Sequence, residues 1–237
     1  MKKTIKKIIR IALSPFVFFD YLKFKKGEKR FSIKSSDFYP CIKDKTVKTG
    51  FDAHYVYHTS WAARKVREIN PQRHTDISSS LFFSGIVSAF VPTDFYDYRP
   101  ADLKLSNLTS NNADLTKLPF ADNSINSLSC MHTVEHIGLG RYGDPIDTNG
   151  DLKAISELKR VLAENGSLLF VVPVGQPKIE FNAHRIYSYE QIISYFPDLS
   201  LREFSLITDG GKFIENSNPE LVKNQKYGCG CFWFIKK

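Results

Sequence analysis

The sequence has few cysteines and no long hydrophobic run, and each shortage excludes a class of protein. Its 237 residues include 4 cysteines, and no two of them form a C-x-x-C pair. That number is too small for a disulfide scaffold and the spacing predicts no bound metal, so a reducing, cytoplasmic compartment fits best. The apolar stretch near the start is interrupted by Arg10 and Pro15, and it is shorter than the roughly 20 apolar residues that cross a bilayer. No small-residue cleavage site follows it, which argues against a signal peptide.

Positive charge is concentrated in the first part of the chain. The formal net charge is +8, and residues 1–50 hold many of the lysines, whereas the remainder is close to balanced. This distribution disfavours nucleic acid as a partner of the main domain. Residues 1–24 combine basic side chains with an apolar helical face formed by Ile5, Ile8, Ile9, Ala12 and Leu13. The pattern predicts a helix in the membrane interface, on the inner face of the plasma membrane. The alternative is a helix that packs on its own domain or on another subunit.

From residue 51 onward, the hydrophobic pattern alternates between strand and helix. We expect helices over residues 52–69, 81–90, 151–162 and 188–195. We expect strands over residues 73–77, 93–98, 108–113, 125–131, 167–172, 201–208 and 228–235. The chain thus divides into a basic amphipathic segment with a connector (1–50) and one domain (51–237). Strands that alternate with helices and end in a closing pair predict a Rossmann-like α/β fold, with a doubly wound, mostly parallel sheet and an antiparallel edge strand.

Local signals set the core face and the ends of the predicted helices. The first helix offers Tyr55, Trp61, Ala62 and Val66 to a core, and Asn70-Pro71 ends it. Asn165-Gly166 suits the left-handed C-cap of the helix that starts at residue 151. The continuous apolar run that follows predicts a central parallel strand with helices on both faces.

Two stretches of the domain resemble class I S-adenosylmethionine (SAM)-dependent methyltransferases. One runs from Asp114 through Leu118-Pro119-Phe120 to Glu135-His136, and the other is the helix-to-strand passage from Glu157 to Pro173. More narrowly, the chain resembles DUF268, a family of uncharacterised methyltransferase-like proteins. Four short motifs carry that likeness: His74-Thr-Asp-Ile-Ser-Ser79, Asp97-Tyr-Arg-Pro100, His132-Thr-Val-Glu-His136 and His184-Arg-Ile-Tyr187.

The resemblance implies SAM as the cofactor and assigns residues to it. In open α/β sheets, ligands bind beyond the carboxyl ends of the strands, where the strand order reverses. Asp76 ends the first strand there, and Asp97 ends the second, where it suits the ribose hydroxyls or serves only as a turn residue. Asp114, followed by Leu115, takes the family's acidic position at the adenine. A serine loop replaces the family's glycine-rich loop, and its hydroxyls suit the methionine carboxylate, although serine resists a positive φ; it consists of Ser78, Ser79 and Ser80.

The candidate catalytic residues directly follow the fourth predicted strand. Methyl transfer to a hydroxyl requires a general base, and His136 is the first choice because imidazole titrates near neutral pH. Glu135 would orient this base or bind the acceptor, and His132 completes the group. The alternative is that His136 only bonds a carbonyl at the strand end. The order H-x-x-E-H also matches inverted zinc peptidases, but that motif requires a helix, and Gly138-Leu-Gly140 interrupts one. We therefore treat the zinc match as coincidental.

Two polar loops are expected to bind the acceptor. Arg141 and Tyr142 lie in a long loop over residues 138–150 and suit a polyhydroxylated or anionic small molecule or glycan. His184 and Arg185 follow the central strand, and Arg185 suits a phosphate or carboxylate. The sequence predicts a SAM-dependent methyltransferase that acts on a hydroxyl of a sugar or glycan precursor. The alternative is a catalytically inert methyltransferase-like binding or scaffold protein at the membrane surface. The oligomeric state is not predicted.

Overall fold

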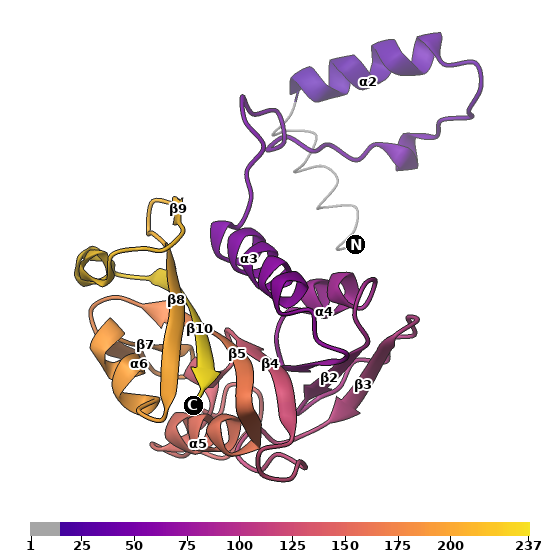
Figure 1. The fold of residues 1–237 in the computed structure, drawn as a ribbon. Coiled ribbons are helices and arrows are strands. Elements are labelled where there is room, and N and C mark those ends of the chain that lie inside the picture. The colour runs from indigo at the N-terminus through magenta and orange to yellow at the C-terminus, as the bar shows by residue number, and fades with distance from the viewer. Residues whose placement is uncertain (1–14) are drawn as a thin grey trace. The chain divides into compact units, whose positions relative to one another are not determined.

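The computed structural model describes residues 15–237 (Figure 1). The predicted interfacial segment covers residues 1–24, and its part before residue 15, which carries the apolar face from Ile5 to Leu13, lies outside the described residues. The chain forms two compact units that meet between Phe51 and Asp52. Within the described part, no helix combines the length and the apolar character that a bilayer span needs.

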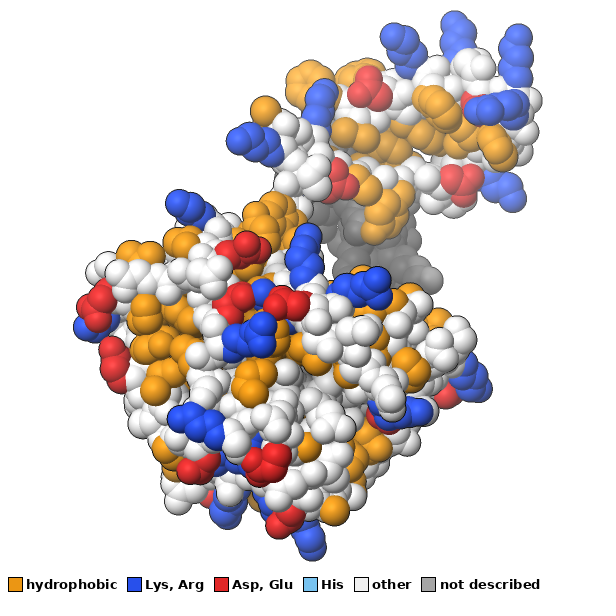
Figure 2. All heavy atoms as spheres, in the orientation of Figure 1, with side chains coloured by type: hydrophobic (Ala, Val, Ile, Leu, Met, Phe, Trp, Pro, Cys, Tyr) orange, Lys and Arg blue, Asp and Glu red, His pale blue; other side chains and the backbone are white. Residues whose placement is uncertain are grey.

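The N-terminal unit contains helix α2 (Pro15–Gly27) and a 3-10 turn (Ser35–Asp37). The rings of Phe18 and Tyr21 pack edge-on against Phe38, with ring centroids 5.5 and 5.1 Å away. The region expected to be a plain connector therefore includes the end of a helix and a small aromatic cluster. Other phenylalanines of α2 point outward, and hydrophobic and lysine side chains are exposed together on this unit (Figure 2).

The main domain is built on one eight-stranded sheet with the order β3-β2-β1-β4-β5-β10-β8-β9. Its strands are β1 (His74–Ile77), β2 (Thr93–Asp97), β3 (Leu108–Asn112), β4 (Ile125–Met131), β5 (Leu162–Val174), β8 (Leu199–Ile207), β9 (Phe213–Ile214) and β10 (Gly228–Lys236). Strands β1 to β5 pair in parallel, β10 lies antiparallel between β5 and β8, and the edge strand β9 is antiparallel to β8. The predicted fold class is confirmed.

Helices cover both faces of this sheet (Figure 1). One face packs against α3 (Ala53–Ile69) and α4 (Leu81–Val87), and the other packs against α5 (Gly150–Val161) and α6 (Tyr189–Tyr195). On β5, Leu168 and Phe170 join one core, whereas Leu169 and Val171 join the other. Burial on both faces explains why β5 is apolar without alternation.

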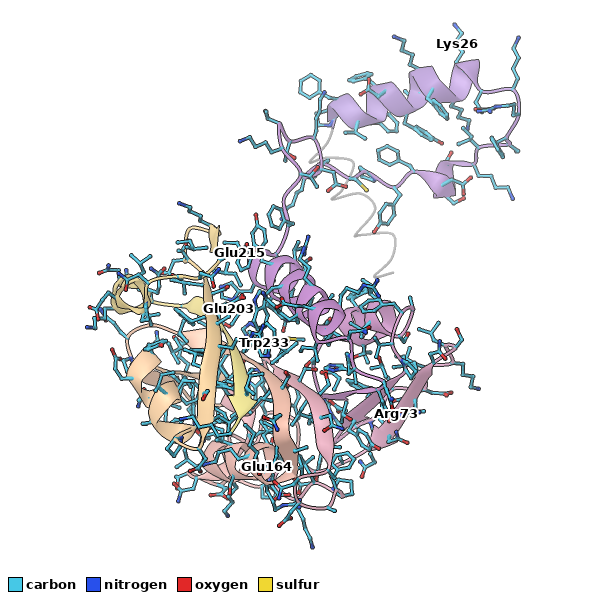
Figure 3. All side chains as sticks on the ribbon, in the orientation of Figure 1. Lys26, Arg73, Glu164, Glu203, Glu215 and Trp233 are labelled. Atoms are coloured by element: carbon cyan, nitrogen blue, oxygen red, sulfur yellow. The ribbon has the colours of Figure 1, made fainter. Side chains whose placement is uncertain are left out.

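Helix α3 begins and ends as its sequence predicts. The carboxylate of Asp52 caps its start, and Asn70 ends it with a left-handed φ of 50°. Trp61 is buried as expected, and its indole nitrogen donates to Glu203 of β8, which lies opposite Trp233 of β10 (Figure 3). Tyr55 was expected in the core, but its side chain is 48% exposed. Tyr55 instead lines a surface cleft at the candidate site.

The predicted C-cap at Asn165-Gly166 is wrong. Helix α5 ends at Val161, and Asn165 lies inside β5. Asn165 does adopt a left-handed φ of 59°, at a point where the pairing between β4 and β5 is irregular. The residue pair therefore supplies the expected backbone conformation in a strand irregularity. A small hairpin, β6 (Lys178–Glu180) and β7 (His184–Ile186), was also not predicted.

Candidate functional site

A cleft of about 280 Å³ opens beyond the carboxyl ends of β1, β2, β3 and β4. Strand β1 lies between β2 and β4, so this is the point where the strand order reverses. The cleft is lined by residues that follow each of these strands, including Ser78, Asp97, Asp114, Leu115, His132 and His136. The structure thus brings together six residues that the sequence assigns to the cofactor or to catalysis.

The serine loop adopts the backbone conformation that glycine usually supplies. Ser78 has a φ of 55°, and its backbone N–H donates to the carbonyl oxygen of Tyr96 at 2.7 Å. Ser79 is buried and its hydroxyl accepts from the backbone N–H of Met131. Ser80 is the N-cap residue of α4. Of the three serines, only Ser78 lines the cleft, so Ser79 and Ser80 support the loop rather than forming the wall.

Asp76 lies beneath the cleft and does not line it, which corrects the predicted contact with the cofactor. Its side chain is fully buried, and its two carboxylate oxygens accept hydrogen bonds from the hydroxyls of Ser84 and Ser129. Because Ser129 gives its proton to Asp76, its oxygen accepts from Nε2 of His74 at 2.9 Å. Burial raises the pKa of Asp76 to about 6. This polar chain ties β1 to β4.

Two carboxylates at the ends of β2 and β3 do line the cleft. Asp97 uses Oδ1 to accept from the backbone N–H of Arg99 at 2.7 Å. Asp114 uses Oδ1 to accept from the backbone N–H and the hydroxyl of Thr116, at 2.8 and 2.7 Å. These turns hold each carboxylate at its strand end. Each keeps a second oxygen that is suited to accept from a ligand.

The histidines follow β4 in a tight, strained turn. His132 has a φ of 54°, an unusual value for a residue with a bulky side chain, and a 3-10 turn spans Val134–His136. His132 Nδ1 lies 2.9 Å from Glu135 Oε1, and His132 Nε2 lies 3.3 Å from the sulfur of Cys229. Burial raises the pKa of Glu135 to about 7. This turn is not the helix that the zinc-peptidase motif requires.

The shorter of two contacts favours one tautomer of His136. Its Nδ1 lies 2.6 Å from the carbonyl oxygen of Ala183 and 3.2 Å from Nη1 of Arg141. A carbonyl only accepts and a guanidinium only donates, so the closer carbonyl favours a proton on Nδ1. Nε2 is then the basic nitrogen, 3.7 Å from Glu135 Oε1. Burial lowers the pKa of His136. The carbonyl bond that we considered as an alternative role is present, and it leaves Nε2 available for a proton.

A second cleft of about 380 Å³ lies on the other side of these histidines. Its lining comes from the start of α3, from the segment after β4, and from the segments after β8 and before β10. The residues include Asp52, Ala53, His54, Tyr55, Glu135, Arg141, Asp209 and Tyr227. His132, His136 and Tyr142 line both clefts. Sequence reasoning missed His54 and Tyr227, although His54 and His58 are spaced to share one face of α3, which is a usable signal.

The loop after the histidines is organised by one carboxylate. Asp144 accepts from the backbone N–H groups of Gly138 and Gly140 at 2.7 and 3.3 Å and from that of Tyr142 at 3.2 Å. Gly138 has a φ of 80°, and a Cβ there would lie 2.0 Å from the carbonyl oxygen of Asp147. The loop thus places the Tyr142 ring edge-on to His136, with ring centroids 5.6 Å apart.

Arg185 is a structural residue, which corrects its predicted role. Only 5% of it is exposed, its Nη1 donates to the carbonyl oxygen of Ile137 at 2.7 Å, and its Nε lies 3.5 Å from the carboxylate of Asp151. No part of its guanidinium lines either cleft. His184 also lies outside both linings, and its ring packs against Tyr227 with centroids 4.8 Å apart. The β6–β7 hairpin, which carries both residues, therefore supports the site by contacting Ile137 and Tyr227.

The sheet order and the cleft at its reversal point define the class I SAM-dependent methyltransferase fold. A putative sarcosine dimethylglycine methyltransferase from Galdieria sulphuraria is similar, with a TM-score of 0.55 and 14% identity over 77% of this chain and 86% of that one. A putative methyltransferase from Bacillus halodurans has a TM-score of 0.52 and 12% identity, over 73% of this chain and 98% of that one. The N-methyltransferase NodS from Bradyrhizobium japonicum, solved with S-adenosyl-l-homocysteine (SAH), has a TM-score of 0.50 and 11% identity, over 76% of this chain and 88% of that one. Identities this low show the fold alone.

Residues 100–196 match the model of a family described as "Caenorhabditis protein of unknown function, DUF268". The match confirms the resemblance that the short motifs indicated, and it spans the segment from the end of β2 to α6. No curated protein sequence matches the chain.

Proposed function

We propose that the protein is a SAM-dependent methyltransferase that methylates a hydroxyl of a sugar or glycan precursor. One observation carries this proposal: His132, His136 and Tyr142 line both the cleft at the strand-order reversal and a second, polar cleft, so the two clefts adjoin at these residues. Methyl transfer needs a cofactor and an acceptor on opposite sides of one short gap. Two adjoining clefts support that arrangement.

The first cleft suits SAM because of the groups at its rim. Asp97 and Asp114 each have an oxygen that is not used by their own turn, so Asp97 would hold the ribose hydroxyls and Asp114 the adenine end. Leu115, which is buried at the cleft wall, offers an apolar surface to the base. Ser78 would hold the methionine carboxylate by turning its hydroxyl away from the carbonyl oxygen of Tyr96, to which it donates at 3.2 Å. Its left-handed φ shows that serine takes the backbone conformation that glycine usually supplies in this loop.

The second cleft suits a polar acceptor. Arg141 donates to the carbonyl oxygen of Ala183 at 3.0 Å and lies against the Tyr142 ring, so its charge is held at the cleft. Bound SAM supplies an electrophilic methyl group, and His136 Nε2 takes up the proton of the acceptor hydroxyl. Ala183 keeps the His136 ring oriented through Nδ1. Glu135, beside Nε2, stabilises the positive charge that the ring then acquires.

The experiment is methyl transfer with labelled SAM. We would incubate the full chain with SAM carrying a deuterated methyl group and with nucleotide sugars or lipid-linked glycans, and detect labelled product by mass spectrometry. His136→Ala should lower turnover by about 100-fold or more, because a general base contributes that much. Arg73→Ala is the matched control, since Arg73 precedes β1 and pairs with Asp94 at the opposite end of the strands. Full turnover by His136→Ala would remove the base assignment, and a folded, SAH-binding protein without any labelled product would favour the binding-protein alternative.

We also propose that the N-terminal unit brings the domain to an anionic membrane surface, where lipid-linked acceptors would be found. Its helix α2 exposes Phe16, Phe19 and Phe24 at 83%, 67% and 62%. Lys25 and Lys26 follow in the last turn. Exposed aromatic rings with adjacent lysines suit the interface of an anionic bilayer.

A further inference from the structure

A histidine and cysteine cluster lies at the base of the second cleft. His54 of α3, His132 after β4 and Cys229 of β10 each bring one ligand atom to within 4.8 Å of the others. His132 Nε2 and the sulfur of Cys229 are 3.3 Å apart. The side chains of Cys229 and His132 are buried, whereas His54 reaches the cleft wall. Three elements that are remote in sequence thus converge on one small volume.

His132 is oriented as a metal-binding histidine would be. Its Nδ1 donates to the buried carboxylate of Glu135, so its Nε2 carries a lone pair, and that lone pair faces Cys229. A carboxylate behind a ligating histidine is the usual arrangement at protein metal sites. The left-handed φ of His132 is unfavourable in conformational free energy, and such backbone conformations cluster at functional sites.

Buried acceptor atoms without partners surround the cluster. His58 Nδ1 lies 2.6 Å from the carbonyl oxygen of His54, so His58 Nε2 carries a lone pair. That nitrogen and Glu135 Oε2 are both buried and have no hydrogen-bond partner among the described residues. The His58 ring contacts the His132 ring, with centroids 4.9 Å apart. Unpartnered buried acceptors are costly, and a nearby cation would compensate for them.

We propose that His54, His132 and Cys229 bind one Zn²⁺ ion, with the fourth position open to the second cleft. Imidazole nitrogen and thiolate sulfur are ligands that zinc prefers, whereas calcium and magnesium prefer oxygen. Zn–N bonds of roughly 2.05 Å and Zn–S bonds of roughly 2.3 Å at tetrahedral angles put the N and S atoms about 3.6 Å apart. The observed 3.3 Å between His132 Nε2 and Cys229 Sγ is close to that value. All three ligand atoms lie within 4.8 Å of one another, so no remaining separation has to shorten by more than about 1.5 Å to reach zinc-site values.

Zinc binding would replace one proton. In the metal-free chain the Cys229 thiol donates to His132 Nε2. When zinc enters, the S–H bond breaks, the proton leaves to solvent, and Zn–S and Zn–N bonds form. The fourth ligand would be a water molecule in the second cleft, which His54 and His132 both line. The site stands apart from methyl transfer, because its ligands can bind zinc whether or not the domain binds SAM.

Zinc binding can be measured directly on the full chain with its purification tag removed. The chain is stripped with a chelator and titrated with Zn²⁺ in competition with a chromophoric chelator, without SAM. We expect one zinc per chain, and His54→Ala and Cys229→Ser should each weaken binding by about 100-fold or more. Cys231→Ser is the matched control, because Cys231 is a buried cysteine on the same strand that is not part of the cluster, and it should bind as the wild type does.

A second readout does not depend on the folding of variants. Wild-type protein loaded with Co²⁺ should show a thiolate-to-cobalt charge-transfer band and the intense visible bands of a four-coordinate ion. Folded wild-type protein that fails to compete for zinc would overturn the site, and so would a Cys229→Ser variant that binds zinc as tightly as the wild type. A chain that binds zinc but transfers no methyl group would refute the proposed activity and leave the zinc site intact.

Discussion

At the scale of single residues, the structure separates side chains that serve the clefts from those that hold the walls. Arg185 and Asp76 both look functional in the sequence because each is a charged residue at or beyond the end of a predicted strand. Both prove to be buried and engaged by protein groups. The sequence shows which residue types are near the strand ends, but the turn of the chain that directs each side chain inward or outward is not encoded in any short motif.

Replacing Arg185 should therefore destabilise the folded protein rather than weaken acceptor binding. Arg185→Met removes the guanidinium that contacts Asp151 and the carbonyl oxygen of Ile137. An uncompensated buried partner typically costs about 3–5 kcal/mol, so the free energy of unfolding in urea should fall by that order. The matched change Arg141→Met, at an exposed position on the cleft, should leave the unfolding midpoint almost unchanged. Equal stability of Arg185→Met and wild type would contradict the structural role.

Asp76 should make stability depend on pH in a direction opposite to that of a salt-bridged carboxylate. Its pKa rises from 3.8 in the unfolded chain to about 6 in the folded one, so between about pH 4 and pH 6 the folded state binds more protons. The free energy of unfolding contributed by this group therefore falls as pH rises through that window. The fall is about 3 kcal/mol at most, at 1.36 kcal/mol per pKa unit.

The comparison of wild type with Asp76→Asn isolates this effect. The groups that face Asp76 are the hydroxyls of Ser79, Ser84 and Ser129. His74 lies behind Ser129, and Asp97 is nearby. They are the same in both proteins, so their own titration largely cancels. Urea unfolding at pH 4.5 and pH 7 should show the stability of the wild type falling relative to the variant as pH rises. A constant difference would show that Asp76 does not titrate in this range.

At the scale of elements, hydrophobic periodicity predicts most helices and strands. It does not predict the order of the strands in the sheet or the short hairpin. The alternation in the sequence predicts α3, α5 and strands β1 to β5 within a few residues. It does not predict that β10 enters between β5 and β8, because that placement depends on which strands pair and not on the pattern within each strand. The hairpin of β6 and β7 is too short and polar to produce a periodic signal.

Helix α2 is the element on which the membrane proposal depends. Sedimentation with liposomes rich in anionic lipid should pull down the full chain, and replacing both Phe16 and Phe19 with Ser should reduce the bound fraction several-fold, because two exposed rings leave the interface. Phe18→Ser is not a useful control, since Phe18 packs on Phe38. The better control is Phe82→Ser, because Phe82 lies on α4 in the main domain and is 84% exposed. Equal sedimentation of all three proteins would end the proposal.

At the scale of the whole molecule, the sequence predicts the fold and the first cleft better than the second. Asp97, Asp114 and His136 follow successive strands, so the rule for parallel sheets brings them together. His54, Tyr227 and Cys229 come from the first helix and the last strand region of the domain, and only the completed fold places them beside His132. Such long-range convergence has no local sequence pattern, and for this reason the second cleft and the histidine and cysteine cluster were not predicted.

The central claim is that the cleft at the strand-order reversal binds a SAM-type cofactor through Asp97, and calorimetric titration of the full chain with SAH tests it most directly. We predict one binding site per chain. Asp97→Ala should weaken binding by about 10-fold to 100-fold, because it removes a charge-assisted hydrogen bond worth about 1.5–3 kcal/mol. Asp198→Ala, an exposed carboxylate beyond α6, should bind as the wild type does. Absence of binding by a folded sample, or equal affinity of wild type and Asp97→Ala, would contradict the account.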